Sequence, residues 1–542
     1  MGNSGEIPGL CRSCEGKSQV RMPTPGVSRR HNDDLISASH REGVRTLFSG
    51  FTACPGLFYA TSAQDGILSR LRIPGGILNS QQCQAIADIA DNYGGGYVDV
   101  TNRANLQIRE ISQGINSGVL QQLQNLGLGS HNSAVDHIRN IMTSPTAGID
   151  PAELIDTRPL VRNWDDYIAA HPELSGLSAK FSVCFDGGGK VAVSDRLNDI
   201  LFTTELIDTQ VYLRLHLGLI KSKPPIDTGI ILLPEQCLSI LAALADVYLH
   251  HIDINSQCKP RLREIVNSLG WENYLQQVEQ RLNFSWQRCE KFINTSSQTK
   301  TEECFSHIGV HPQRQENLFY IGVVLPLGRL ESQQIRRLGD LAAKYGSGTI
   351  RLTPWQNLLI TDIHQKSVID VQNKIAEFGL DSTVTNIKSS LIACSGKQGC
   401  AASATDTKGH ALALADYLET HVKLDSPINI HFSGCEKSCA QHHNSDITLL
   451  GVSDGLRPAV GARNIESYHV YVGDRENHAK FGRKIYQYVS FAELPALIEQ
   501  ILKVYKIYRF NHDESFLEFV NRYSITQLKD LLKSPKICVN LR

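Results

Sequence analysis

The stretch PGGILNSQQCQAIADIADNYGGGYVDVTNRANLQI at residues 74–108 decides the fold, because a second copy, PLGRLESQQIRRLGDLAAKYGSGTIRLTPWQNLLI, occupies residues 326–360. Without gaps, 15 of the 35 aligned positions are identical, whereas average amino-acid usage would give about two by chance. A more divergent repeat follows each copy, in which residues 198–200 (Asn-Asp-Ile) align with residues 445–447 (Ser-Asp-Ile). The sequence therefore predicts an A–B–A–B duplication, with two homologous halves packed about a pseudo-twofold axis around a central cleft.

The repeat combines strand and helix patterns. Residues 67–73 alternate apolar and polar side chains before a Pro-Gly-Gly turn, Ser80 suits a helix N-cap, and residues 97–108 alternate again as a strand. This order predicts the fold class α+β. We divide the chain into units A1 (residues 51–128), B1 (129–304, with a helical insert), A2 (305–380), B2 (381–505) and a C-terminal helical tail (506–542). Residues 1–50 lack a sustained hydrophobic period, which predicts a poorly ordered extension.

The composition is globular and excludes several function classes. The chain has 542 residues, 41% hydrophobic and 20% charged, with a formal net charge of −1. Without a global basic excess we expect no nucleic-acid or anionic-membrane partner, and no apolar run approaches the roughly 20 residues that span a bilayer. No apolar signal segment precedes the 14 cysteines, so we expect a cytoplasmic protein, in which clustered cysteines bind metal or react.

Four of the cysteines are clustered in B2. Cys394 and Cys400 form Cys-x5-Cys, and Cys435 and Cys439 form Cys-x3-Cys. Four thiolates suit either tetrahedral zinc or an iron–sulfur cluster. Because zinc ribbons and fingers favour Cys-x2-Cys pairs, the wider spacings here favour a [4Fe-4S] cluster.

A1 carries a set of cationic and amide side chains that A2 has almost entirely lost. The period of a strand predicts that Arg70 and Arg72 share one face, and that Arg103, Asn105, Gln107 and Arg109 share one face of the following strand. The A2 positions that match these six are Gly322, Val324, Trp355, Asn357, Leu359 and Thr361. B1 adds Arg139 and Lys180. A solvated strand face is one explanation, but charge restricted to one of two copies favours anion binding, since Arg can bind carboxylates bidentately.

These features make the chain, from about Phe51 to its end, similar to the sirohaem/[4Fe-4S] sulfite and nitrite reductase superfamily. The matching features are the duplication, the spacing of the four cysteines and the stretch Thr101-Asn-Arg-x-Asn-x-Gln. The resemblance implies that A1 and A2 are ferredoxin-like half-domains, and that the cysteines hold a [4Fe-4S] cluster. It also implies that Cys439 bridges to sirohaem iron and that Arg70, Arg139 and Lys180 are catalytic anion-site residues. The fourth anion-site residue, Lys or Asn in the family, is Ser182 here.

Two segments resemble the cobalamin-pathway branch of this superfamily, the precorrin-3B synthases: Lys180-Phe…Phe185-Asp-Gly-Gly-Gly189 and Ser433-Gly-Cys-Glu-Lys-Ser-Cys-Ala440. This resemblance implies an oxygen-dependent hydroxylation and lactonisation of precorrin-3A. A mononuclear non-haem iron is then a further candidate cofactor. The tetrapyrrole carboxylates would be held by Arg72, Arg103, Asn105, Gln107 and Arg109.

Two other functions remain open at this point. The first alternative is a ferredoxin-dependent nitrite or sulfite reductase, in which the tetrapyrrole is bound sirohaem rather than substrate. The second is an electron-transfer protein. No Gly-x-Gly-x-x-Gly opens a helix after a strand, so we expect the electrons to come from a separate ferredoxin or NAD(P)H-dependent reductase. We also expect a monomer.

Overall fold

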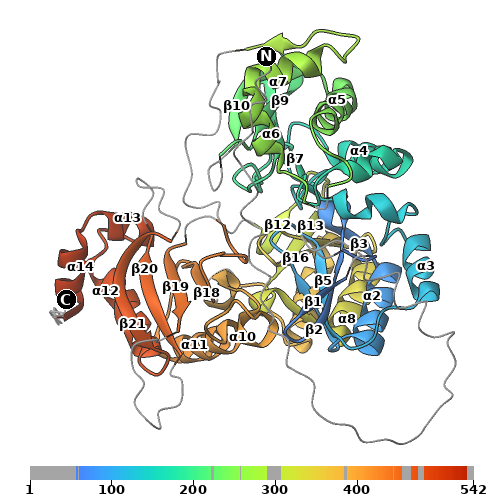
Figure 1. Ribbon diagram of the computed structural model, residues 1–542. Coiled ribbons are helices and arrows are strands. Elements are labelled where there is room, and N and C mark those ends of the chain that lie inside the picture. Colours follow the sequence, from blue (N-terminus) through green and yellow to red (C-terminus); the bar gives the residue numbers. More distant parts are fainter. Residues whose placement is uncertain are drawn as a thin grey trace, which may run out of the picture.

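The computed structural model describes residues 56–58, 60–220, 225–256, 258–289, 307–383, 387–442, 445–453, 466–473 and 481–533. The predicted extension at residues 1–50 lies outside this part of the chain. A1 and A2 together form a central body, and B1 and B2 are separate lobes attached to it (Figure 1). The fold class is α+β, as the repeat predicts.

Two five-stranded sheets form the central body, and each is completed by a strand of the other half. The strand orders are β1-β2-β5-β4-β14 and β12-β13-β16-β15-β3. A1 supplies β1 (Thr61–Ala63), β2 (Gly66–Leu71), β3 (Ile77–Asn79), β4 (Tyr97–Val100) and β5 (Leu106–Ile111). A2 supplies β12 (Gly309–Pro312), β13 (Leu318–Val323), β14 (Arg329–Glu331), β15 (Thr349–Leu352) and β16 (Leu358–His364). Antiparallel pairing of β14 with β4, and of β3 with β15, locks the two halves together.

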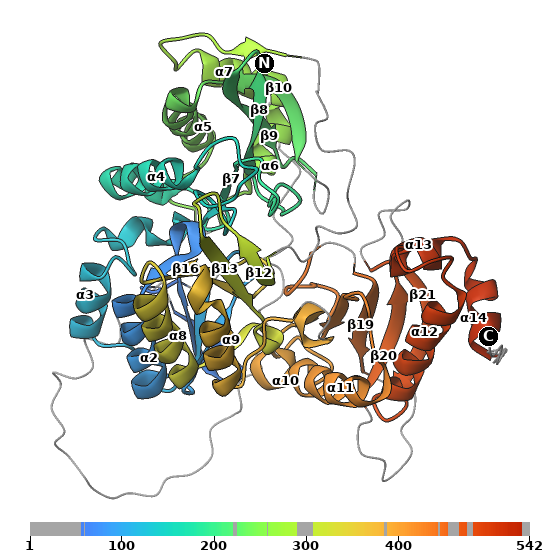
Figure 2. The same cartoon turned by 180° about the vertical axis from the view of Figure 1, so that it is seen from behind.

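The two halves also share one hydrophobic core. Ile86 and Ile89 of A1 lie in the same cluster as Ile335 and Leu338 of A2, and these side chains are at most 4% exposed. The helices are α2 (Ser80–Tyr93), α3 (Ser117–Asn125), α8 (Ser332–Tyr345) and α9 (Val368–Glu377). Seen from behind, the blue A1 helix α2 stands beside the yellow A2 helix α8 (Figure 2). Each half thus buries its apolar helix face against the other.

B1 and B2 repeat one sheet topology. The B1 strands are β6 (Ile141–Thr143), β7 (Val183–Asp186), β8 (Ile200–Ile207), β9 (Gln210–Leu217), β10 (Ile226–Leu232) and β11 (Gln287–Arg288). The B2 strands are β17 (Leu391–Ala393), β18 (Ile430–Ser433), β19 (Ile447–Val452), β20 (Ser467–Val472) and β21 (Arg483–Ser490). In both sheets the first three strands are parallel and the next two antiparallel. Val183 pairs with Ile200 in B1 as Ile430 pairs with Ile447 in B2, which is the alignment that the divergent repeat predicts.

Helices cover both B sheets. In B1 they are α4 (Arg158–Ala170), α5 (Cys237–His250), α6 (Leu262–Leu269) and α7 (Trp271–Glu279). In B2 they are α10 (Gly396–Gly399), α11 (Thr407–His421), α12 (Leu494–Tyr508), α13 (Phe516–Asn521) and α14 (Ile525–Lys533). Each lobe has its own apolar core. The last two helices contribute Phe516, Phe519 and Leu528 to the B2 core.

Local hydrogen bonds make the A1–A2 duplication visible at atomic detail. The Asn105 backbone N donates to Thr101 Oγ1 at 3.1 Å, and the Asn357 backbone N donates to Thr353 Oγ1 at the same distance. Ala104 and Gln356, which occupy the same place in the two loops, have φ angles of 53° and 61°. Left-handed backbone is uncommon outside glycine, so the shared conformation is a specific feature of the repeat.

Two local predictions differ from the structure. The predicted strand over residues 97–108 is a hairpin, in which β4 and β5 pair antiparallel on either side of residues 101–105. Arg103 and Asn105 therefore lie in the loop and do not share a strand face with Gln107. The N-cap of α2 is Asn79, one residue before Ser80, because Asn79 and Gln82 satisfy each other's backbone N–H groups in a capping box.

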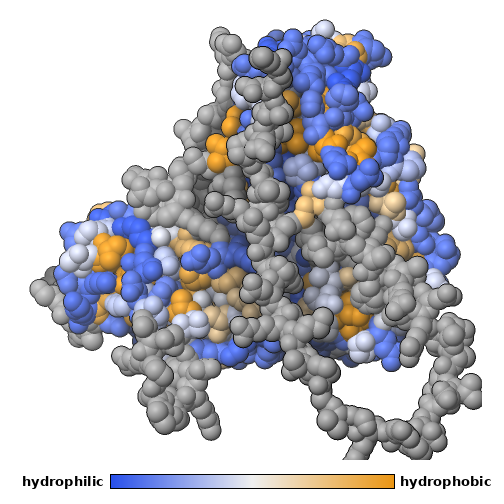
Figure 3. Space-filling model, in the orientation of Figure 1, coloured by the Kyte–Doolittle hydropathy of each residue, from blue (hydrophilic) through white to orange (hydrophobic). Residues whose placement is uncertain are grey.

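Hydrophilic side chains predominate on the visible part of the described surface (Figure 3). Figure 3 shows mainly hydrophilic residues on the visible parts of both lobes, with apolar side chains in small separate patches. Among the described residues, no helix is both long and apolar enough to cross a membrane.

The core shared by A1 and A2 can be tested with two isoleucines of A2. Ile335 in α8 is 0% exposed, whereas Ile369 in α9 is 71% exposed. We expect Ile335→Ala to lower the free energy of unfolding by about 2–5 kcal/mol, and Ile369→Ala by less than about 0.5 kcal/mol. Urea denaturation followed by circular dichroism measures both. Equal effects would contradict the shared core.

Candidate active site

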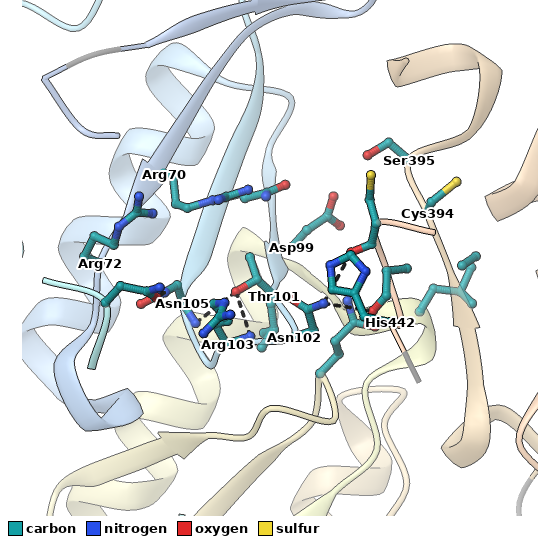
Figure 4. A pocket seen from close by; sticks show the side chains of 18 of the residues that line it. Arg70, Arg72, Asp99, Thr101, Asn102, Arg103, Asn105, Cys394, Ser395 and His442 are labelled. Carbon is teal, nitrogen blue, oxygen red and sulfur yellow. Dashed lines mark hydrogen bonds between the residues drawn. The ribbon is translucent and has the colours of Figure 1, made fainter. Parts of the chain in front are cut away.

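A cavity of about 440 Å³ lies where the four units meet, a volume typical of small-molecule sites. A1 lines it with Arg70, Arg72, Asp99, Val100, Thr101, Asn102, Arg103, Asn105 and Gln107. B1 adds Asn140, Ala179, Lys180 and Arg261; A2 adds Leu327 and Gln356; B2 adds Ala393, Cys394, Ser395, Lys408, Cys439, Ala440 and His442. The A1 arginines stand on one side and Cys394 and Ser395 on the other (Figure 4).

The cavity wall in A1 is a row of polar side chains across one sheet. Arg70 pairs with Gln107, Gln107 with Asp99, and Asp99 with Arg329 of the exchanged strand β14. Opposed residues on neighbouring strands point to the same face. With its amide oxygen turned toward Arg70, Gln107 accepts a hydrogen bond from the guanidinium Nε at 3.3 Å.

The matching row in A2 is largely apolar. It runs from Gly322 through Leu359 and Arg351 to Ile77. Arg351 is only 3% exposed and donates to the carbonyls of Pro145 and Ala147 at 3.0 and 2.7 Å. The backbone is thus duplicated, but the polar wall is built in one copy alone.

A charge network at the cavity wall is centred on the buried carboxylate of Asp99. Lys408 Nζ, from α11 of B2, donates to Asp99 Oδ1 at 2.9 Å, and Arg329 Nε donates to the same oxygen at 3.0 Å. Burial raises the pKa of Asp99, but the two cations outweigh it and hold that pKa below its ordinary value. Burial lowers the pKa of Lys408. Three units thus share one carboxylate beside the cavity.

The 101–105 loop is braced against B1. Arg103 donates from Nη1 to Asn198 Oδ1 and from Nη2 to the Leu197 carbonyl, both at 2.7 Å. Burial lowers the pKa of Arg103. The Asn105 side chain accepts from the Ile73 backbone N at 2.7 Å and donates to Asn140 Oδ1 at 3.3 Å. Both residues line the cavity, but the bonds that the structure shows for them organise the surrounding backbone.

The other predicted residues divide into two groups. Arg70, Arg72, Gln107 and Lys180 line the cavity, and the Lys180 side chain is exposed there. Arg72 is 2% exposed and donates from Nε to the His137 carbonyl at 3.3 Å. Arg109 and Arg139 are not part of the lining.

Arg139 is held by carboxylates of its own lobe. Its guanidinium donates to both oxygens of Asp165 at 2.8 Å and lies 3.6 Å from Asp136. The residue is 6% exposed. Arg109 is similarly paired with Asp65, on the B2 side of the hairpin. Both guanidinium groups are therefore engaged with local counter-charges.

Sequence reasoning did not identify Asn102, Arg261 or Lys408 as cavity residues. Asn102 donates to backbone carbonyls of B2, Arg261 pairs with Asp199 at 2.8 Å, and Lys408 pairs with Asp99. The only hint in the sequence concerned Asn102, because A2 has Pro354 at the matching position. Nothing in the sequence pattern distinguishes Lys408 from a solvated helix lysine.

The four cysteines converge because they follow neighbouring parallel strands. Cys394 comes directly after β17, and Cys435 comes two residues after the end of β18. Burial and the neighbouring thiols of Cys435, Cys394 and Cys400 raise the pKa of Cys439. The Gly434 backbone N donates to Cys394 Sγ at 3.2 Å. In B1 the corresponding positions hold Ser144 and Gly188.

This donor set fits a [4Fe-4S] cluster. Four thiols and a backbone N–H directed at sulfur are the features by which proteins hold and tune such clusters. Within the described part of the chain, no three His, Cys, Asp or Glu side chains converge on a position for a single metal ion. The sequence spacings of the four cysteines, Cys-x5-Cys and Cys-x3-Cys, favour the cluster over zinc.

Removing one thiol tests the cluster. Cys400→Ser should abolish most of the iron and acid-labile sulfide per chain after anaerobic purification, because iron–sulfur clusters are held by thiolates. Cys237→Ala, in the buried α5 of B1, is the control and should retain both. Full iron and sulfide in Cys400→Ser would exclude Cys400 as a ligand.

Asp99→Asn leaves two half-buried cations without their carboxylate and should cost about 1.5–3 kcal/mol of stability, as for hydrogen bonds to charged groups. The folded-state pKa of Asp99 lies below its ordinary value, which is about 3.9 in unfolded chains. The stabilisation is therefore complete above that value and is lost as the pH falls through the lowered one. Thermal unfolding from neutral to acidic pH should show the difference between the two proteins shrinking. A difference that does not change with pH would contradict the ion pair.

Comparison with known proteins gives the family. The "Nitrite/Sulfite reductase ferredoxin-like half domain" matches residues 61–126 and 311–378, and the "Nitrite and sulphite reductase 4Fe-4S domain" matches residues 134–285 and 385–536. A ferredoxin–nitrite reductase of Synechococcus elongatus is 29% identical over 458 residues, covering 82% of this chain and 88% of that protein. The chloroplastic ferredoxin–nitrite reductase of Arabidopsis thaliana is 30% identical over 459 residues, covering 82% and 78%.

A solved structure supports the fold. The Mycobacterium tuberculosis NirA protein matches with a TM-score of 0.71 at 23% identity, covering 85% of this chain and 84% of that one. The two half-domain matches and the two 4Fe-4S-domain matches alternate along the chain as A1, B1, A2 and B2 do. Since they span most of the sequence, the chain belongs to the nitrite and sulfite reductase family.

Proposed function

We propose that this protein is a ferredoxin-dependent nitrite reductase that binds sirohaem in the cavity beside its [4Fe-4S] cluster. The observation that carries the proposal is that one cavity is lined by the cations of A1 and B1 and by Cys394 and Cys439. The relatives named as ferredoxin–nitrite reductases align over 82% of the chain. This function was the alternative in the sequence analysis, and the comparisons favour it over the precorrin-3B synthase.

Different residues of the chain would hold the two cofactors. The four cysteines would hold the cluster, with Cys439 also at the sirohaem. The carboxylates of a sirohaem would find cations at Arg72, Arg261 and Lys408 in the cavity lining. Such a pair of cofactors supplies single electrons and an iron that accepts an anionic ligand.

The remaining cations suit the substrate. Arg70 and Lys180 line the cavity from A1 and B1. Guanidinium and ammonium groups bind small oxyanions through charge-assisted hydrogen bonds. Reduction of nitrite to ammonium consumes protons as well as electrons, and the Lys180 ammonium would donate protons to a bound anion. Arg70, braced by Gln107, would fix the orientation of that anion.

Position 182 keeps the synthase as a second candidate. Ser182 is 0% exposed, and its hydroxyl donates to Asp199 Oδ2 at 3.3 Å. It therefore adds no cation or amide to the cavity, where the reductases have Lys or Asn. A cavity with one fewer anion-binding group is compatible with precorrin-3A as a substrate.

The absorption spectrum and turnover of the anaerobically purified protein test the proposal. We expect sirohaem bands, and reduction of nitrite to ammonium with reduced ferredoxin as the donor. Lys180→Gln should lower kcat by about 100-fold or more, as for loss of a general acid, while sirohaem content stays constant. Lys374→Gln is the control, because Lys374 pairs with Glu377 on the A2 surface.

Three outcomes would contradict parts of this assignment. Faster turnover of sulfite than of nitrite would show that sulfite, not nitrite, is the substrate. Absence of sirohaem, with oxygen consumption that depends on precorrin-3A, would replace the function with that of the synthase. Normal nitrite turnover in Lys180→Gln would remove Lys180 from the proton path.

A further inference from the structure

We infer that the β4–β5 hairpin of A1 clamps both cysteine loops of B2, and that Asn102 and Arg109 are the positioning residues of the cluster. The hairpin belongs to a different unit from the cysteines. Its loop residue Asn102 contacts the Cys439 loop, and its strand residue Arg109 contacts the loop that carries Cys400. The inference rests on the family's [4Fe-4S] cluster and does not depend on which substrate is reduced.

Arg109 is the stronger of the two contacts. Its Nη2 donates to the Gly399 carbonyl at 2.7 Å, one residue before Cys400. The guanidinium is itself fixed by Asp65, with Nε and Nη2 donating to the two carboxylate oxygens at 2.8 and 3.0 Å. Arg109 is 4% exposed. A buried bidentate pair has one geometry, so the third bond has a defined direction.

The Gly399 carbonyl, to which Arg109 donates, has no hydrogen-bond donor available within its own short helix. Gly399 is the last residue of the short helix α10, and terminal helix carbonyls have no partner within the helix. Arg109 thus caps the turn from which Cys400 projects.

Glycine at position 399 permits the contact. A Cβ placed there would lie 2.6 Å from Arg109 Nη2 and 3.1 Å from Asp65 Oδ2. No alanine could occupy the position without displacing the guanidinium. The close approach of Arg109 therefore accounts for the glycine before Cys400.

Asn102 holds the second cysteine loop. Its Nδ2 donates to the Cys439 carbonyl at 3.3 Å and to the Ala440 carbonyl at 3.2 Å. Because the side chain leaves the tip of the hairpin, its amide reaches the residue that bears the thiol and the next one. One rigid hairpin thus bonds to both loops.

The other half of the molecule holds its matching loop with different residues. Asn102 and Arg109 correspond to Pro354 and Thr361 of A2, and the Thr361 hydroxyl donates to the neighbouring Asp362. In B1 the position of Gly399 is held by Ile149, whose carbonyl accepts from the Arg314 backbone N at 2.7 Å. Within the described residues, bonds of the Asn102 and Arg109 kind therefore occur in the half whose B unit carries the cysteines, whereas Arg351 of A2 holds the carbonyls of Pro145 and Ala147 in B1.

The physical consequence concerns the cluster itself. Groups that orient metal ligands typically account for about 10–100-fold in metal affinity. Without Arg109, Cys400 is on a loop with an unsatisfied buried carbonyl, and its thiolate has more orientations available. We expect the cluster to be lost faster and its midpoint potential to shift, although all four cysteines remain.

Arg109→Met tests this directly. The visible iron–sulfur absorbance, followed with time in the presence of EDTA and air, should decay about 10-fold faster than in the unchanged protein. The matched control is Arg281→Met in B1, which also removes an arginine that pairs with an aspartate, Asp246, and donates to a backbone carbonyl, that of Gln277. Its cluster should decay at the original rate.

Two further variants keep the test decisive if Arg109→Met folds poorly. Gly399→Ala leaves every charge in place and only pushes the guanidinium away, and Asn102→Ala releases the other loop. Each should accelerate cluster loss and shift the midpoint potential, with secondary structure unchanged by circular dichroism. Unchanged decay and potential in Gly399→Ala and Asn102→Ala would overturn the inference, as would an unchanged protein that holds no cluster. A stable cluster without nitrite turnover would instead contradict only the proposed function.

Discussion

The exchange of β3 and β14 between the two central sheets is the constraint on which the rest of the structure depends. An edge strand without a partner leaves backbone N–H and C=O groups unsatisfied, and each half satisfies them with a strand of the other. Neither half can complete its sheet or bury its helix face alone. The exchange also places Arg329 of A2 opposite Asp99 of A1. A charged cavity wall made by separate parts of the chain follows from this pairing.

A symmetric backbone carries an asymmetric chemistry. The loops at residues 101–105 and 353–357 have the same hydrogen bonds, yet one bears Arg103 and the other Trp355. The parallel strands of both B lobes end at equivalent places, but only those of B2 lead to cysteines. Because the halves are interlocked, the cations of one face the thiols of the other. Divergence of side chains on a duplicated scaffold was therefore enough to create a single composite site.

The limits of sequence reasoning are visible at particular residues. Alternation over residues 97–108 did not reveal the hairpin, since within the loop at 101–105 the polar and apolar order is interrupted at Asn102 alone. Arg109 and Arg139 were expected to bind a tetrapyrrole or an anion. Their carboxylate partners, Asp65 and Asp165, lie 44 and 26 residues away in the chain. Lys408 and Asp99, which form an ion pair, are 309 residues apart in the chain. No local sequence pattern could predict that contact.

By itself, the sequence determined the duplication, the α+β class, the four cysteines and the presence in A1 of arginines that A2 lacks at the matching positions. These properties depend on residue identity and on short-range periodicity, both of which the linear sequence contains. Only the tertiary structure decided which cations line the cavity and which are held by carboxylates elsewhere. The reason is that a buried charge must be paired, and its partner is chosen by proximity after folding. Arg70 and Lys180 thus line the cavity, whereas Arg109 is bound to Asp65 and the cysteine loop.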